Sequence, residues 1–365
     1  MREMTFMVKV GICAHFGFGK ELMNGQTDKS LAVWNALKKE YGEDQVAVLD
    51  THGWQKNPAA TLLGCRRLIK QCENVIMLPG RNGVKLFPRL FAALNHSEHR
   101  RLHYVAIGGW LADWLKKDDS LRRAFARLDI IYVEGDQLKN ALDKLGFERV
   151  ILLPNFRSCR ILAPEELVTQ TELPLKLCTF SRIEKAKGVE DAVEVVRRIN
   201  KKMGKTVYTL DIYGNIEKQY EKRFKECEAG FEPFITYKGF VQGEESASAI
   251  LRSYYAMLFP TYYHGEGFAG AIISAFSAGL PVIATDWRCN PEVIRDGVDG
   301  ILYPTRDNAW LERILTDLAL HPDKLNALKS NCLERAAHYS ASNVIHILTR
   351  EMDGETHNER EAVKA

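Results

Sequence analysis

The sequence lacks the features that mark several classes of protein. Its eight cysteines include no Cys-x-x-Cys pair, which argues against a zinc or redox site and favours reduced core thiols in a cytosolic protein. The 50 basic and 47 acidic residues leave a net charge of only +3, too small to suggest nucleic acid as a partner. No apolar run approaches the ~20 residues of a membrane-spanning helix, and the N-terminal residues lack a signal peptide's apolar core. We therefore expect a cytoplasmic protein.

Two common nucleotide-binding motifs are incomplete. Gly17-Phe-Gly19 follows the first apolar run, but Leu22 stands where a dinucleotide fingerprint has its third glycine. Glu21 follows Lys20, where a P-loop needs serine or threonine. Binding of NAD or ATP through these motifs is therefore disfavoured.

Short apolar runs alternate with helical patterns along the chain. The runs show no period-two alternation, which is typical of strands buried on both faces of a parallel sheet. Repeated strand–helix units predict an α/β fold with doubly wound sheets. The predicted strands are residues 8–14, 45–50, 74–78, 103–107, 130–134, 149–153, 175–180, 208–213, 234–237, 256–259, 282–284 and 301–303. Predicted helices include residues 28–41, 137–145 and one that begins at about 268 and stops at Gly279.

The alternation is interrupted once, between Pro154 and Pro174. We therefore expect two Rossmann-like domains with a cleft between them. The predicted segments are an N-terminal domain over 1–157, a linker over 158–174, a C-terminal domain over 175–340, and a helix over 341–365 that crosses back to the first domain and ends in a frayed tail.

One segment predicts an anion site. The apolar run 256–259 ends at Pro260, and the polar loop after it carries a single carboxylate, Glu266. A helix of small residues follows, and a helix that starts beyond a parallel strand points its free N–H groups and positive dipole end into the ligand crevice. Because Ala269 and Gly270 have little or no side chain, a phosphate can approach this backbone closely.

Two further segments follow predicted strands or open helices. Arg182 and Lys187 lie where a strand meets a helix and would suit a diphosphate, although two cations on a loop can also be simply solvated. The segment Asn24-Gly-Gln-Thr-Asp opens the first helix, where Thr27 or Asp28 would serve as an ordinary N-cap.

In combination and order, these motifs resemble the family-4 glycosyltransferases of the GT-B fold. The segments are Ser-Arg-x-x-x-x-Lys-Gly, Glu-Gly-Phe, Ala-Gly-Leu-Pro-Val-Ile-Ala-Thr-Asp and Asn-Pro-Glu. In the first half, Asn-Gly-Gln-Thr and Ala-Ile-Gly-Gly-Trp110 resemble the branch that builds bacterial capsule and surface polysaccharides. The resemblance covers most of the chain. It implies a retaining enzyme that moves a sugar from a nucleoside diphosphate sugar and needs neither metal nor cofactor, and the sequence has no Asp-x-Asp pair.

The resemblance also implies roles for single residues. Arg182 and Lys187 would bind the donor diphosphate and stabilise the leaving nucleotide, and Glu266 would contact hydroxyls of the donor sugar. Phe268 and Ala269 would bind the donor through their backbone N–H groups, and Gly267 and Ser274 are also implied to bind it. Gly25 and Gln26, in the acceptor-side first domain, would close over the diphosphate.

Two positions depart from the family pattern. Ser274 stands where the family has the second glutamate of a pair, so one hydroxyl would replace the usual bidentate contact with the ribose. The alternative is that Ser274 is a small helix-packing residue. The family's first-domain histidine should follow the strand 103–107, where Gly108-Gly109-Trp110 stands. His103 lies at the other end of that strand and is interpreted as structural, while His15 and His264 are positional candidates.

The acceptor implied by the resemblance is a glycan or a lipid-linked saccharide. Residues 100–101 and 115–127 concentrate positive charge, which would dock on an anionic membrane surface at the inner face or form a solvated helix face. Two alternatives stay open. One is a nucleotide-sugar epimerase of the two-domain type, and the other is a catalytically silent partner subunit that binds nucleotide-sugar.

Overall fold

The computed structural model describes residues 7–19, 25–241 and 244–354. The predictions that concern Lys20, Glu21, Leu22 and Asn24, and the predicted frayed tail after residue 354, lie outside this part of the chain.

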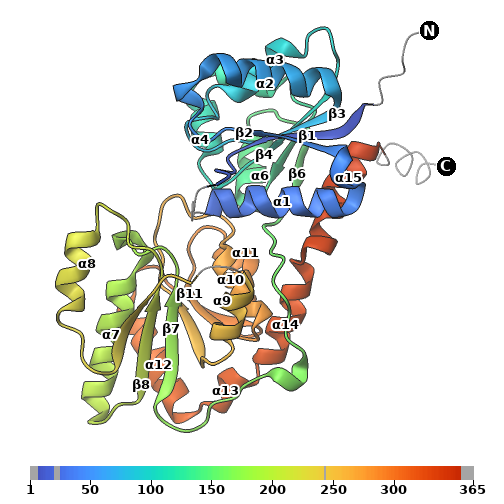
Figure 1. Cartoon of the computed structure of the whole chain (residues 1–365). Coiled ribbons are helices and arrows are strands. Elements are labelled where there is room, and N and C mark those ends of the chain that lie inside the picture. Colours follow the sequence, from blue (N-terminus) through green and yellow to red (C-terminus); the bar gives the residue numbers. More distant parts are fainter. Residues whose placement is uncertain (1–6, 20–24, 242–243, 355–365) are drawn as a thin grey trace. The chain divides into compact units, whose positions relative to one another are not determined.

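The chain divides into two compact units (Figure 1). The first unit comprises Met1–Phe156 together with Ala341–Ala365, and the second comprises Arg157–Ser340.

A six-stranded parallel sheet in the order β2-β1-β3-β4-β5-β6 forms the centre of the first unit. From β1 the chain adds β2 on one side and then β3 on the other, so the direction in which strands are added reverses between β1 and β3. Ligands of open α/β sheets bind outside the carboxyl ends of the strands at such a reversal. The strands are β1 (Val8–Ala14), β2 (Val46–Asp50), β3 (Cys72–Leu78), β4 (Arg101–Val105), β5 (Ile130–Val133) and β6 (Val150–Leu152).

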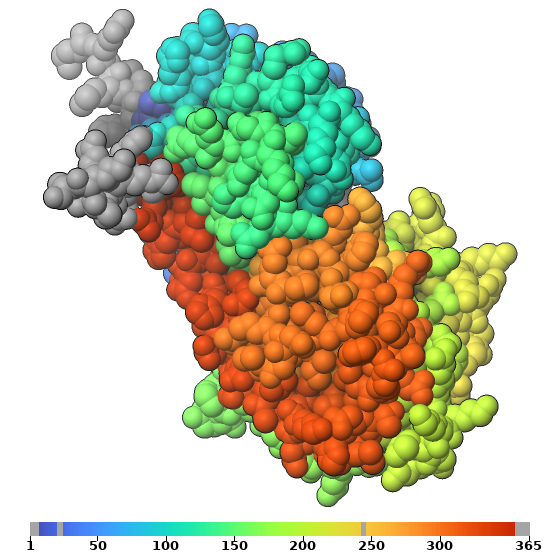
Figure 2. Space-filling model, turned by 180° about the vertical axis from the view of Figure 1, so that it is seen from behind, coloured from blue at the N-terminus to red at the C-terminus, as the bar shows by residue number. Residues whose placement is uncertain are grey.

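Both faces of this sheet are buried under helices. Successive residues of β3 enter different cores: Val75 and Met77 pack on one face, and Ile76 and Leu78 on the other. Helices α2 to α6 cover the first face, and α1 and α15 cover the second (Figure 1). In Figure 2, the cyan-to-green segments of this unit lie side by side on its surface. The helices are α1 (Gly25–Tyr41), α2 (Pro58–Gln71), α3 (Phe87–Leu94), α4 (Leu111–Lys117), α5 (Asp119–Phe125), α6 (Asp136–Asp143) and α15 (Ala341–Asp353).

The second unit has a parallel sheet in the order β12-β11-β10-β7-β8-β9, which reverses between β7 and β10. In β10, Ala256 and Leu258 enter one core and Met257 and Phe259 the other, so this sheet is also covered on both faces. The strands are β7 (Leu175–Phe180), β8 (Tyr208–Tyr213), β9 (Ile235–Gly239), β10 (Ala256–Phe259), β11 (Val282–Thr285) and β12 (Gly300–Tyr303). The helices are α7 (Val189–Met203), α8 (Glu221–Glu228), α9 (Glu244–Leu251), α10 (Gly270–Ser277), α11 (Asn290–Val293), α12 (Asn308–Leu320), α13 (Asp323–Asn326) and α14 (Lys329–His338).

The predicted fold of two Rossmann-like doubly wound sheets is confirmed, and each predicted strand is present. Several boundaries were wrong, since β3 begins two residues earlier than predicted, β9 ends two residues later and α6 ends two residues earlier. Helix α1 begins at Gly25 rather than Asp28, so Thr27 and Asp28 lie in its first turn instead of capping it. Strand β4 lies two residues earlier than predicted, over Arg101–Val105, and helix α10 begins at Gly270 and ends at Ser277.

The segment expected as a linker, 158–174, lies along the second unit. The Cys159 thiol donates to Ser277 Oγ over 3.1 Å, and the backbone N–H of Leu162 donates to the Ser277 carbonyl over 2.9 Å. Further along, the Gln170 amide donates to the Ser253 carbonyl over 2.8 Å. These bonds fix the path of the segment on that unit.

His103 has the structural role that its position in the sequence indicates. It is fully buried in β4, with Nδ1 3.2 Å from the Tyr132 hydroxyl and Nε2 3.1 Å from Asn74 Oδ1. Burial lowers the pKa of His103 to about 3, and the charges of Arg101 and Arg149 act in the same direction.

This histidine should make the protein less stable in acid. In the unfolded chain its pKa is about 6.5, so below that pH the unfolded state binds the extra proton and the free energy of unfolding falls by about 1.4 kcal/mol per pH unit until the folded pKa is reached. Between about pH 6.5 and pH 5 we expect a loss of about 2 kcal/mol from this residue. Denaturant unfolding at several pH values should show a shallower acid slope for His103→Gln, and an unchanged slope for the exposed control His96→Gln.

Candidate functional site

The loops that follow β7 and β10 lie at the reversal of the second sheet. Residues 181–188 follow β7 and residues 260–269 follow β10. The two loops are joined by a backbone hydrogen bond, in which the Tyr262 N–H donates to the Ala186 carbonyl over 2.8 Å. Sheet order therefore brings together the segments that carry Arg182, Lys187 and Glu266.

Lys187 and Glu266 form a buried ion pair. Lys187 Nζ lies 2.8 Å and 2.7 Å from the two carboxylate oxygens of Glu266, and the residues are only 9% and 6% exposed. The Thr261 hydroxyl donates to Glu266 Oε2 over 2.6 Å. Lys187 Nζ also lies 5.2 Å from the centre of the Tyr263 ring, a cation–π contact. The lysine and the carboxylate are therefore held in one position by several groups.

Gly188 allows this close approach of the two loops. Its φ is 72°, and a Cβ there would lie 2.2 Å from the carbonyl oxygen of Pro260, the first residue of the other loop. Any side chain at 188 would push the loop that carries Lys187 away from the loop that carries Glu266.

Gly188→Ala should therefore destabilise the protein by about 3 kcal/mol or more, because it combines a left-handed backbone with a clash against main chain. Gly204 is a matched control at the other end of α7, with φ 65° and no atom within 4 Å of its added Cβ. Gly204→Ala should cost only about 1–2 kcal/mol. Urea unfolding of both variants measures the difference, and equal losses would mean that the loops do not need to approach this closely.

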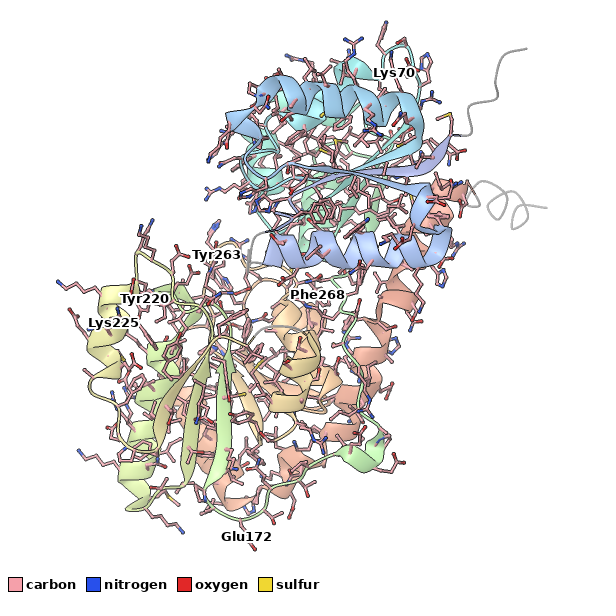
Figure 3. All side chains as sticks on the ribbon, in the orientation of Figure 1. Lys70, Glu172, Tyr220, Lys225, Tyr263 and Phe268 are labelled. Carbon is pink, nitrogen blue, oxygen red and sulfur yellow. The ribbon has the colours of Figure 1, made fainter. Side chains whose placement is uncertain are left out.

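Arg182 is the more accessible of the two cations predicted to bind the diphosphate. Its side chain is 42% exposed and lies 3.6 Å from Glu184 and 3.9 Å from Glu217. Partial burial would lower the pKa of Arg182, but the charge of Glu184, with smaller effects of Tyr263 and Glu217, raises it above its usual range. The guanidinium carbon lies 5.5 Å from the centre of the Tyr263 ring, so one tyrosine, labelled in Figure 3, contacts both cations.

Helix α10 begins beside these loops. Its N-cap residue, Ala269, supplies no side-chain hydrogen bond to the first turn. Phe268 is buried, with its ring 4.8 Å from that of Tyr339, which anchors the start of the helix (Figure 3). The Arg157 guanidinium packs against Gly270, since a Cβ on Gly270 would lie 2.1 Å from Arg157 Nη2. Sequence reasoning missed Arg157, which had no signal beyond its place at the end of the first domain.

Ser274 is buried in α10, and its hydroxyl donates to the Gly270 carbonyl one turn earlier over 3.2 Å. This is the helix-packing arrangement that the sequence left open as the alternative, and contact with a ribose stays a prediction. Gly267 is half-buried in the loop, and His264 is exposed.

Three residues without a predicted role brace the loop after β10. The Thr285 hydroxyl donates to the Thr261 carbonyl over 2.5 Å, and the Trp287 indole N–H donates to the Tyr263 carbonyl over 2.7 Å. The Asn290 amide in turn donates to the Thr285 carbonyl over 3.0 Å. Thr285 and Asn290 belong to motifs that the sequence shows, but the carbonyls to which they donate could not be identified from it.

In the first unit, Gln26 lies in the first turn of α1 beside the loop after β3. A Cβ on Gly80 would lie 2.4 Å from Gln26 Oε1, so the amide rests on the Gly80 backbone. Gly25, at the start of the helix, is exposed. Contact of Gly25 and Gln26 with a diphosphate stays a prediction.

A histidine pair lies at the carboxyl ends of β1 and β2. His15 Nε2 is 3.2 Å from His52 Nδ1, and His15 Nδ1 is 3.2 Å from the Thr27 hydroxyl. Asp50 accepts backbone N–H bonds from Phe16 and His52, over 3.0 and 2.8 Å. Burial lowers the pKa of His15, and the charge of His52 acts in the same direction.

Within the described ranges, no group of three or more His, Cys, Asp and Glu side chains has the arrangement of a metal site. In the same part of the chain, no helix combines the length and apolar character that crossing a membrane requires.

The chain is similar in sequence to glycosyltransferases. Residues 174–319 match the family model described as glycosyl transferases group 1. The amylovoran biosynthesis glycosyltransferase AmsK of Erwinia amylovora is 28% identical over 150 residues, which are 40% of this chain and 36% of AmsK. The GtfA subunit of the UDP-N-acetylglucosamine–peptide N-acetylglucosaminyltransferase of Streptococcus gordonii is 30% identical over 158 residues, 43% of this chain and 29% of that subunit. The matched part thus spans about a third of these relatives.

The chain shares the GT-B fold with solved structures. The crystal structure of Alr3699/HepE of Anabaena in complex with UDP has a TM-score of 0.75 at 14% identity, over 95% of this chain and 100% of that one. Its complex with UDP-glucose gives 0.72 at 13% identity, over 95% and 99%. Because the sequence identity is so low, this structural similarity shows the GT-B fold alone.

Proposed function

Because residues 174–319 form a domain of the glycosyl transferases group 1 family, we propose that the protein transfers a sugar from a nucleoside diphosphate sugar to a glycan or lipid-linked acceptor in polysaccharide biosynthesis. The names of relatives support the process, since AmsK is an amylovoran biosynthesis glycosyltransferase. The complexes of HepE with UDP and UDP-glucose support the donor class.

The observation that carries the proposal is the grouping of Arg182, Lys187 and the start of α10 at the reversal of the second sheet. Two cations and the positive end of a helix suit a diphosphate, whose negative charge grows as the bond to the sugar breaks. Arg182 would bind the diphosphate through two N–H groups of its planar guanidinium, and Lys187 would bind it through a single ammonium group. These groups supply the stabilisation that a divalent metal provides elsewhere.

Glu266 would contact the hydroxyls of the donor sugar. Lys187 occupies both of its oxygens, so the carboxylate is placed as a hydrogen-bond acceptor rather than as a nucleophile. In this proposal the acceptor hydroxyl attacks the face from which the diphosphate leaves, and the transferred sugar keeps its anomeric configuration.

A screen of nucleoside diphosphate sugars tests the function. Slow release of one nucleotide, unchanged by EDTA, supports a metal-independent transferase. Formation of an epimer would instead support the epimerase, and a thermal shift without turnover would support the silent subunit. Activity that returns only with magnesium or manganese would contradict the metal-free assignment.

The charged segments expected to dock on a membrane are engaged in other contacts. Arg101 donates to the carbonyls of Glu351 and Met352 over 3.0 and 3.4 Å, which caps the last turn of α15. In α4 and α5, Arg122 lies 3.0 Å from Asp119 and Lys116 lies 4.0 Å from Asp113. These pairs reduce the charge available to a lipid surface.

For a lipid-linked acceptor we infer that α2 is the docking element. Its exposed face carries Arg66, Arg67 and Lys70, the last labelled in Figure 3, and the helix has no acidic residue. Leu63 on the same face is 67% exposed, and its neighbour Leu62 is 41% exposed. Exposed leucines beside cations suit a bilayer with anionic headgroups.

The full chain should co-sediment with vesicles that contain anionic lipid, and less so as salt rises. Arg66→Ser with Lys70→Ser should weaken binding by about 1 kcal/mol per residue, whereas the control pair Lys116→Ser with Arg122→Ser should change it little. Equal binding to neutral vesicles, or equal loss in both pairs, would remove α2 as the docking element.

A further inference from the structure

Two tryptophans and two cations gather at the carboxyl ends of β3 and β4 in the first unit. The rings of Trp110 and Trp114 lie 4.6 Å apart, at the start of α4. From the loop after β3, the Arg81 guanidinium carbon lies 5.7 Å and Lys85 Nζ 5.2 Å from the centre of the Trp114 ring. Both cations are exposed and both tryptophans are partly exposed. We refer to these four residues as the tryptophan–cation cluster.

The positive charge of this cluster is not neutralised within the described residues. Neither Arg81 nor Lys85 has a carboxylate within salt-bridge distance there. The carboxylates of the adjoining helices pair elsewhere: Asp118 with Arg89 over 2.7 Å, and Asp113 with Lys116 over 4.0 Å. Two like charges held near one indole ring repel each other, and an anion placed between them would relieve that repulsion.

The cluster also lies at the ligand edge of its sheet. The order of strands reverses between β1 and β3, and the loop after β3 that carries Arg81 follows this reversal directly. The same loop includes Gly80, on which the Gln26 amide rests. Aromatic rings with a few convergent charged groups at such an edge are typical of a small-molecule site.

We propose that the tryptophan–cation cluster binds the acceptor and that the acceptor is an anionic saccharide. Arg81 and Lys85 hold its carboxylate or phosphate, and a partly exposed indole packs against a sugar ring. The inference rests on the proposed glycosyl transfer. Since Arg182 and Lys187, in the other unit, are assigned to the donor diphosphate, a second cationic site in the first unit serves the other substrate.

Tryptophan fluorescence of the full chain provides the test without requiring turnover. The probes are a disaccharide that contains glucuronic acid, the same disaccharide with glucose in its place, and a sugar linked through diphosphate to a short prenyl chain. One or both anionic probes should change the fluorescence, and Trp114→Phe should remove that change. Arg81→Ala with Lys85→Ala should weaken binding about tenfold or more, while Lys201→Ala with Lys202→Ala, which removes two exposed cations from the last turn of α7, should leave it unchanged.

The outcome also identifies the source of the anion. Binding of the glucuronic acid probe alone assigns a charged glycan, and binding of the prenyl diphosphate probe alone assigns a lipid-linked acceptor. Equal binding of the neutral disaccharide, binding that the Arg81→Ala/Lys85→Ala variant retains, or no binding of either anionic probe would overturn the inference. UDP binding, measured in parallel by calorimetry, should be unaffected by the cluster variants, so a failure of the proposed donor is recognised separately.

Discussion

Lys187→Ala is expected to lower transfer by about 30- to 1,000-fold, because it removes one charged contact to the leaving diphosphate, worth roughly 2–4 kcal/mol of the barrier. It should also destabilise the fold. Among the side chains that the structure describes, the Thr261 hydroxyl would be the remaining hydrogen-bond donor to the Glu266 carboxylate. Removing one member of a buried ion pair costs about 3–5 kcal/mol.

The double variant Lys187→Ala/Glu266→Gln separates the two effects. Without a buried unpaired charge it should recover most of the stability but none of the activity. Recovery of both would mean that Lys187 serves the fold alone.

Arg182→Ala should lower transfer to a similar extent with little effect on stability, since the Arg182 side chain is 42% exposed and its ion pairs are long. Arg198→Ala is a matched control, an arginine of α7 with similar exposure. The measurement is turnover at saturating donor together with the denaturation midpoint. Near wild-type turnover in both Arg182→Ala and Lys187→Ala would mean that the diphosphate is bound elsewhere.

Glu266→Gln is expected to reduce transfer by about 10- to 100-fold, the value of a hydrogen bond from a sugar hydroxyl to a carboxylate, about 1.5–3 kcal/mol. Affinity for the free nucleotide should fall much less or even rise, because Lys187 would lose its carboxylate partner and become available to the diphosphate. This split distinguishes contact with the sugar from contact with the nucleotide.

Calorimetry with the nucleotide and a transfer assay measure both quantities. Glu217→Gln, which removes another carboxylate near Arg182, is the control and should leave transfer within about twofold. Full transfer activity in Glu266→Gln would mean that Glu266 does not contact the donor sugar.

The sheets were predictable because their strands are buried on both faces. A short continuous apolar run such as 256–259 is typical of a strand that is buried on both faces, and its limits agree with β10. Helix ends were less predictable. The first turn of α1 includes Gly25, which has low helix propensity, and this turn makes tertiary contacts such as that of Gln26 with Gly80.

The candidate site was predictable as a set of residues but not as an arrangement. Lys187 and Glu266 are 79 positions apart, and their pairing depends on β7 lying beside β10 in the sheet. The capping of α15 by Arg101 also depends on topology, since charge density in the sequence could not show that Arg101 donates to carbonyls of that helix. Motif spacing in the sequence identifies which residues can bind a ligand, whereas the order of the strands in the sheet decides which of these residues contact one another.

The central claim is that the donor binds at the carboxyl ends of β7 and β10. Hydrogen–deuterium exchange of the full chain with and without UDP-glucose, or whichever nucleoside diphosphate sugar the screen selects, tests it most directly. We expect slower exchange of the amides in residues 181–188 and 262–273 on binding, and loss of this protection in Arg182→Ala. Protection confined to other segments, with these two loops unchanged, would contradict the account.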